Sequence, residues 1–318
     1  MGSHDARHGL DRRALLSLGA AAAGLGLGAS RAAAQDTQDV SADQARTPRP
    51  IKRSLKLGMV GEGETVLDKF LLLRDLGYDG VELDSPSGLV PDEVLRAKEE
   101  SGLEIPGVVD SVHWRDTLGD PDAAVRSRGR DGLETALRDA QRYGASTVLL
   151  VPAVVNGVIR YDQAYDNCQA EIASMLPLAE ELGVQIAFEN VWNNFLLSPV
   201  EARDFVDSFE SDVVGWYLDL GNLVRYAWPD HWVHTLGSRI LKLDIKDYSR
   251  SLQNESGPWS GFGVKIGEGD VGWEATMAAL DSIQWGCRGV HWASAEVGGG
   301  DRVRLAEILE RMDDVLSR

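Results

Sequence analysis

Residues 184–219, VQIAFENVWNNFLLSPVEARDFVDSFESDVVGWYLD, decide the fold. They contain two short apolar runs, residues 184–189 and 214–219, with an amphipathic segment of helical length between them at 199–209. Such runs, bounded by turn signals, predict buried strands, and the segment between them predicts a crossover helix. Two strands joined in this way are parallel, as in α/β folds.

The same alternation continues in both directions along the chain. We expect eight strands at residues 55–60, 80–83, 105–109, 147–151, 184–189, 214–219, 241–245 and 289–293. We expect eight helices at residues 66–76, 91–101, 122–143, 161–182, 199–209, 231–238, 273–283 and 301–316. Four of the helices precede a glycine suited to a left-handed cap, namely Gly77, Gly102, Gly144 and Gly183. Eight such units predict a single-domain (β/α)8 TIM barrel.

An open, doubly wound sheet is the alternative fold. It would need a glycine-rich phosphate turn after the first strand. Residues 58–63, GMVGEG, match that turn poorly, because Glu62 would repel the anion. The barrel is favoured, since residues 54–318 approach the roughly 250 residues of a single barrel.

The first 34 residues have the features of a twin-arginine export signal. Arg12-Arg13 precede an uncharged run at residues 14–30, and the alanines at 32–34 suit cleavage. A membrane anchor is the alternative, but the run is short and lacks a stop-transfer cluster. We expect a periplasmic or secreted protein with no membrane span in the mature chain. Residues 35–53 are polar and predict a linker.

The formal net charge of −18 argues against nucleic acid as a partner. Cys168 and Cys287 are far apart and neither has a metal-type spacing, so a disulfide after export stays open. Assembly into a homo-oligomer is equally open.

The fifth to eighth predicted strands each lead to a carboxylate at the C-terminal side: Glu189, Asp219, Asp244 and Glu296. Because the loops after the strands form the active rim of a TIM barrel, these side chains should meet. Their repulsion must be relieved by a divalent cation or by protonation, and a hard cation with oxygen ligands is the direct solution. The alternatives are outward-facing loop positions or pairing with Lys or Arg, for which Lys242 and Lys246 are near in sequence.

Four motifs carry a resemblance to a known family. They are residues 188–190 (FEN), 218–222 (LDLGN), 245–247 (IKD) and 267–273 (GEGDVGW). In this order they resemble the xylose isomerase-like TIM barrels, which are sugar-phosphate and free-sugar isomerases and epimerases. The resemblance covers essentially residues 55–316, and the second half is most similar to the L-xylulose-5-phosphate 3-epimerase type. The motifs specify the superfamily and not the sugar.

The resemblance implies a metal site and gives its residues roles. Glu189 and Glu296 would be ligands that also carry protons on opposite sides of the sugar, with Asp219 a ligand between them. The chain departs from the family at Asp244, where the family usually has His. Either Asp244 becomes the fourth ligand, or it leaves the shell and the metal binds weakly or not at all. An all-carboxylate site favours Mn²⁺ or Mg²⁺, with Co²⁺ or Zn²⁺ as the other candidates.

Polar and aromatic residues near the strand ends predict sugar contacts. His113 follows the third strand, where the family often places a His that binds a sugar hydroxyl; the alternative is a loop histidine with a packing role. Trp192 and Asn193 suit a sugar that is apolar on its faces and hydroxylated at its edge, although Trp192 could simply cover the barrel mouth. Lys246, Lys265 and His113 are candidates for stabilising an oxyanion, and Lys265 lies in a long, lid-like connection.

The function that follows is a metal-dependent sugar isomerase or epimerase, moving a proton next to a carbonyl through an enediolate. Export and the acidic chain favour a non-phosphorylated sugar or keto-sugar, so residues 298–300, GGG, predict a close-passing turn and not a phosphate site. A lyase or hydratase of 3-keto-glycosides and a non-catalytic sugar-binding barrel are the alternatives. The DNA-repair endonuclease branch of the superfamily is set aside, because it needs a basic surface and more histidines.

Overall fold

The computed structural model describes residues 50–286 and 290–318. The predicted export signal, most of the predicted linker and Cys287 lie outside the described residues. The strands are β1 (Ile51–Leu55), β2 (Leu83–Ser85), β3 (Gly107–Asp110), β4 (Thr147–Leu150), β5 (Gln185–Glu189), β6 (Val214–Asp219), β7 (Ile240–Ile245) and β8 (His291–Ala295). The helices are α1 (Val66–Leu76), α2 (Pro91–Ser101), α3 (Ala123–Tyr143), α4 (Tyr161–Leu182), α5 (Pro199–Asp207), α6 (Leu220–Val224), α7 (Pro229–Leu236), α8 (Arg250–Ser256), α9 (Trp273–Ser282) and α10 (Arg302–Leu316).

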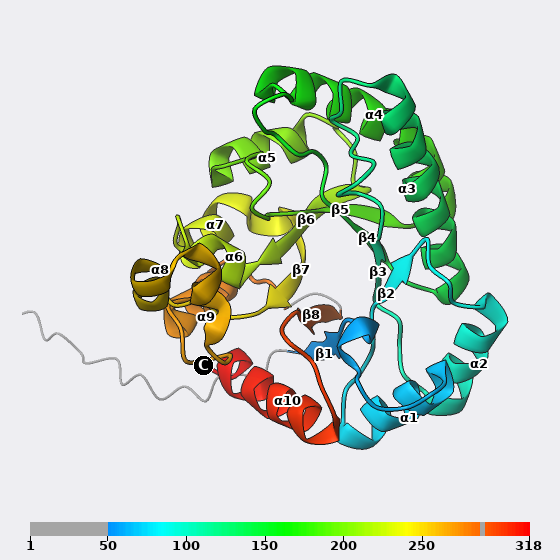
Figure 1. The fold of residues 1–318 in the computed structure, drawn as a ribbon, viewed down its shortest axis with the longest axis vertical. Helices are drawn as coiled ribbons and strands as arrows, with labels where there is room; N and C mark the ends of the chain where they lie inside the picture. The colour runs from blue at the N-terminus through cyan, green and yellow to red at the C-terminus, as the bar shows by residue number, and fades with distance from the viewer. Residues whose placement is uncertain (1–49, 287–289) are drawn as a thin grey trace, which may run out of the picture. The chain divides into compact units, whose positions relative to one another are not determined.

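All eight strands are parallel and pair in the order β1-β8-β7-β6-β5-β4-β3-β2. The ring closes between β1 and β2 through a single parallel bridge from Lys56 to Glu82. There the Leu57 amide donates to the Glu82 carbonyl, and the Glu82 amide donates to the Leu55 carbonyl, both at 2.8 Å. Figure 1 shows the helices arranged around the outside of the strands. The predicted TIM barrel is confirmed.

Local sequence explains where the helices begin and end. Helix α1 starts at a capping box, in which the Thr65 hydroxyl accepts from the Asp68 amide and the Asp68 carboxylate accepts from the Thr65 amide. The four predicted glycine caps all adopt the left-handed conformation, with φ of 97°, 75°, 75° and 66° in chain order. The bounds predicted for α1, α2 and α4 agree with the structure.

Three predicted strands were displaced. Strand β1 spans Ile51–Leu55 and not 55–60, so residues 51–53 belong to the barrel and not to the linker. The search for apolar runs did not find β1, because Lys52 and Arg53 are charged. In the structure these two residues form ion pairs with Glu104 and Asp79, respectively, at the barrel exterior. Strands β2 and β8 are displaced in the opposite direction and lie further along the chain than residues 80–83 and 289–293.

The interior of the barrel is partly polar. Glu82, Lys242 and Tyr217 are almost fully buried there, and the Tyr217 hydroxyl lies 2.9 Å from Glu82 Oε1. Lys242 Nζ donates to the Pro106 carbonyl and lies 3.7 Å from Glu82 Oε1. Lys242 therefore pairs below the rim and is not one of the cations that meet the rim carboxylates. Of the described helices, none combines the length and apolarity that a membrane crossing requires.

Candidate functional site

The four predicted carboxylates do meet at one rim. Glu189 ends β5, Asp219 ends β6, Asp244 lies in β7 and Glu296 follows β8, and one oxygen from each lies within 4.8 Å of the others. Asp219 and Asp244 are register partners on adjacent strands, which fixes their proximity through the backbone. We call these four residues the carboxylate cluster.

Part of the carboxylate cluster is buried without hydrogen bonds, although Lys56 Nζ lies 3.1 Å from Asp244 Oδ1. Oε1 of Glu189 and both side-chain oxygens of Asp244 are buried and accept no hydrogen bond within the described part of the chain. Burial, with the neighbouring carboxylates, raises the pKa of Glu189 and of Asp244 well above their usual range. Orphaned buried oxygens in an all-oxygen donor set fit a hard divalent cation, because such a cation would supply the missing charge.

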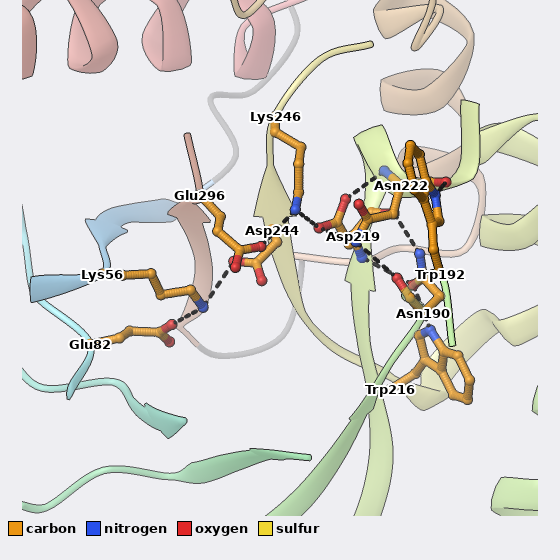
Figure 2. Close-up of polar contacts among 10 residues, drawn as sticks. All are labelled: Lys56, Glu82, Asn190, Trp192, Trp216, Asp219, Asn222, Asp244, Lys246 and Glu296. Carbon is orange, nitrogen blue, oxygen red and sulfur yellow. Dashed lines mark hydrogen bonds and ion pairs between the residues drawn. The ribbon is translucent and has the colours of Figure 1, made fainter. Parts of the chain in front are cut away.

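Lys246 neutralises the other part of the carboxylate cluster. Its Nζ lies 2.7 Å from Asp219 Oδ2 and 2.7 Å from Glu296 Oε2. Figure 2 shows the Lys246 side chain pointing toward these carboxylates. Burial alone would raise the pKa of Glu296, but Lys246 and Lys56 outweigh it and the pKa falls below its usual value. The alternative of lysine pairing is thus realised for Asp219 and Glu296, but among the described residues Glu189 has no ion-pair partner.

No role was predicted for Lys56 from the sequence. It follows β1 directly, and its Nζ lies 2.7 Å from Glu82 Oε2 and 3.1 Å from Asp244 Oδ1. The ammonium also sits 4.8 Å from the centroid of the Tyr217 ring. One signal was available: Glu82 is a charged residue inside an apolar strand run, and in a barrel such a residue needs a buried cation.

The asparagines of the FEN and LDLGN motifs hold the ends of β5 and β6 together. The side-chain amide of Asn190 donates to the backbone carbonyl of Asp219 at 2.7 Å. Oδ1 of Asn190 accepts from the backbone N–H of Asp219 and from Trp216 Nε1. Asn222 donates from its backbone to Asp219 Oδ1 at 2.8 Å and from its side chain to Asp219 Oδ2 at 2.9 Å. These bonds orient the Asp219 carboxylate before any ligand binds.

Asp247 of the IKD motif organises the GEGDVGW motif and does not enter the carboxylate cluster. Its carboxylate accepts from the Gly267 amide at 2.9 Å, from Trp273 Nε1 at 2.9 Å and from the amides of Tyr248 and Val271. Gly269 is required there, since a Cβ would lie 2.2 Å from Asp247 Oδ1. The motif therefore anchors the end of the long connection after β7.

A cavity of about 740 Å³ opens beside the carboxylate cluster. Glu189 and Glu296 line it, and so do three of the predicted sugar contacts, His113, Trp192 and Lys246. Its other lining residues include Asp84, Asp110, Trp114, Trp259 and Phe262, which the sequence did not single out. The segments after β1, β3, β5 and β7 supply much of its wall, as expected for a barrel rim.

His113 is held as a neutral hydrogen-bond donor. Its Nδ1 accepts from the Val151 amide at 3.2 Å, which places the proton of the neutral ring on Nε2. Burial lowers its pKa to about 4. The side chain therefore offers the cavity an N–H group and no positive charge at neutral pH.

Two predicted sugar contacts lie elsewhere. Asn193 is buried, donates to the Ala153 carbonyl at 2.7 Å and accepts from the Phe195 amide, so its side chain braces the loop. Lys265 is paired with Glu307 of α10 at the surface. Neither lines the cavity, because local backbone and surface groups satisfy both side chains.

The glycines after β8 form a close-passing turn, as predicted. Gly300 N donates to the Met59 carbonyl at 3.0 Å, and Gly61 N donates to the Gly300 carbonyl at 2.8 Å. A Cβ at Gly299 would lie 1.9 Å from the Met59 carbonyl oxygen, so only glycine fits. The turn packs against the segment after β1.

Comparison with known proteins agrees with this geometry. The family model described as Xylose isomerase-like TIM barrel matches residues 70–312. The L-ribulose-5-phosphate 3-epimerase UlaE of Salmonella paratyphi C (strain RKS4594) is 25% identical over 236 residues, which cover 69% of this chain and 78% of that protein.

Solved structures share the fold at lower identity. The 3-keto-D-glucoside 4-epimerase YcjR from E. coli has a TM-score of 0.68 and 15% identity, covering 84% of this chain and 100% of that one. The IOLI protein, solved with a bound zinc atom, has a TM-score of 0.68 and 16% identity, covering 84% and 98%. With the family model matching most of its length, this chain belongs to the xylose isomerase-like TIM barrel family.

Proposed function

We propose that this chain is a metal-dependent isomerase or epimerase of a non-phosphorylated sugar or keto-sugar. The carboxylate cluster carries the proposal, because its orphaned oxygens fit a hard cation and two of its members line the cavity. A bound Mn²⁺ or Mg²⁺ would polarise a sugar carbonyl and stabilise the charge that develops when an adjacent C–H proton leaves.

The two glutamates of the cluster are the proton carriers in this proposal. One removes the proton next to the carbonyl, and returning it to the neighbouring carbon gives an isomer. Delivery to the opposite face by the other glutamate gives an epimer. The Nε2–H of His113 and the ammonium of Lys246 donate to sugar oxygens and support the enediolate charge.

The cavity favours a neutral substrate. Four carboxylates line it, those of Asp84, Asp110, Glu189 and Glu296. Its two lining lysines, Lys56 and Lys246, are each paired with carboxylates. A phosphate group would find no guanidinium among the described lining residues, and no lysine there that is free of a carboxylate partner. The twin-arginine signal predicted at residues 1–34 agrees with a periplasmic or secreted sugar enzyme.

Proton exchange and metal content test the proposal together. We expect the purified chain, supplied with Mn²⁺ and a panel of free ketohexoses in D₂O, to place deuterium on a carbon next to the carbonyl. EDTA and Glu189→Gln should abolish exchange, and Asp244→Ala should lower the metal content. Sugar binding without exchange in any metal would identify a binding barrel, and loss of a leaving group from a 3-keto-glycoside would identify a lyase.

A further inference from the structure

The cavity has an aromatic wall that extends beyond the carboxylate cluster. Trp192 comes from the loop after β5, and Trp259 and Phe262 come from the connection after β7. Their ring centroids lie 4.8 Å apart for Trp192 and Trp259 and 5.0 Å apart for Trp192 and Phe262. We call these three residues the aromatic wall.

The inner end of the aromatic wall lies beside Lys246 and the carboxylate cluster. Lys246 Nζ, which contacts Asp219 and Glu296, sits 5.6 Å from the centroid of the Phe262 ring. A sugar ring placed at the carboxylate cluster therefore meets Phe262 and Trp192 first. Trp259 lies 6.4 Å from Phe262 and is 76% exposed, so it forms the outer end.

The aromatic wall is held in a fixed position without a ligand. Trp192 Nε1 donates to the Asn222 carbonyl at 2.9 Å, and the Arg225 guanidinium covers its ring at 4.5 Å. The turn that carries Trp259 is pressed onto Tyr248, where a Cβ at Gly261 would lie 2.2 Å from the ring. An exposed indole held in place beside a cavity is a feature of binding sites, because it offers apolar contact at little cost in conformational entropy.

We propose that the outer aromatic wall binds a second pyranose ring, so that the site prefers a disaccharide or similar glycoside to a free monosaccharide. This rests on the proposed function and names its substrate class. A cavity of about 740 Å³ exceeds what one hexose fills. The apolar C–H face of a pyranose stacks on an indole while its hydroxyls stay in water, and Trp114, 52% exposed, adds a further indole to the lining of the same cavity.

Calorimetric binding to the chain supplied with Mn²⁺ tests this, using glucose, cellobiose, maltose and trehalose. At least one disaccharide should bind about tenfold more tightly than glucose. Trp259→Ala should lower the disaccharide affinity far more than the glucose affinity and so remove that advantage, whereas Trp259→Phe should keep most of it. Trp228→Ala is the matched control, since Trp228 is 57% exposed and does not line the cavity.

Two readouts separate this inference from the proposed function. Disaccharide affinities within twofold of glucose, or an advantage that survives Trp259→Ala, would overturn the second-ring site even if ketohexoses exchange protons. Absence of proton exchange with every sugar, alongside a disaccharide advantage that depends on Trp259, would overturn the proposed function and leave the site intact.

Discussion

Lys56 and Asp244 form a buried ion pair across the mouth of the barrel, with 3.1 Å between Nζ and Oδ1. Asp244 is fully buried, and the same ammonium lies 2.7 Å from Glu82. One cation directly after β1 therefore holds two carboxylates, one directly before β2 and one in β7.

Removing this ammonium should destabilise the barrel. In Lys56→Met, Glu82 and Asp244 lose their shared cation, and breaking a buried pair by removing one partner costs about 3–5 kcal/mol. Urea unfolding at pH 7 measures the loss. Lys52→Met removes a partly exposed ion pair with Glu104 and should cost under about 1 kcal/mol. Equal losses of unfolding free energy in the two variants would show that the buried ion pair stabilises the barrel no more than the partly exposed one.

The metal preference should follow the ligand at position 244. The all-oxygen cluster favours Mn²⁺ or Mg²⁺, and an imidazole nitrogen would favour Zn²⁺. Asp244→His, combined with Lys56→Met so that no ammonium lies beside the new imidazole, should raise the ratio of Zn²⁺ to Mn²⁺ affinity by at least about tenfold. Calorimetric titration gives both affinities. Asp314→His, on an exposed face of α10, is the control, and an unchanged ratio in the double variant would place Asp244 outside the metal site.

Lys246 should compete with the cation. Its ammonium lies 2.7 Å from two members of the carboxylate cluster, so loading the site must weaken those contacts. Lys246→Met should therefore bind Mn²⁺ several-fold more tightly while turning over more slowly, because the proposed oxyanion donor is lost. Titration and kcat separate the two effects. Weaker Mn²⁺ binding in Lys246→Met would mean that the lysine supports the site instead.

His113 should make stability depend on pH. Its pKa is about 4 in the folded chain and about 6.5 when unfolded, so the unfolded chain binds the proton first as the pH falls. The stabilisation that neutral His113 gives to the folded chain is complete above about pH 6.5 and is lost as the pH falls toward 4. His113→Asn keeps an acceptor for the Val151 amide but does not titrate. Between pH 7 and pH 4 the wild type should lose up to about 3 kcal/mol relative to this variant in urea unfolding, and parallel pH curves would refute the assignment.

Asp247 should control the order of the connection after β7. Asp247→Ala removes the acceptor of three backbone amides and the Trp273 indole, where each hydrogen bond to a charged group is worth about 1.5–3 kcal/mol before relaxation. We expect faster hydrogen exchange and proteolysis across residues 249–272. Asp270→Ala, exposed in the same motif with one amide contact, should change little.

Alternation of apolar runs was sufficient to predict the barrel, and the carboxylates were predicted because they end successive strands. These signals are local or repeat at fixed positions along the chain. The first strand was misplaced because Lys52 and Arg53 face outward into ion pairs that only the folded chain reveals.

The contacts that shape the cavity could not be predicted in the same way. Lys56 reaches Asp244 only because the ring closes, and Trp259 reaches Trp192 only because a long connection folds back over the rim. The asparagines of the two motifs were visible, but their role in joining β5 to β6 depends on register.

Lys56 stands at the backbone bridge to Glu82 that helps to join β1 to β2, and its ammonium also contacts Asp244. A ligand that binds the carboxylate cluster therefore acts on a residue that also helps to join β1 to β2. Mn²⁺ binding at the carboxylate cluster and the unfolding of the barrel are thermodynamically linked. The melting temperature measured against Mn²⁺ concentration therefore also reports the Mn²⁺ affinity.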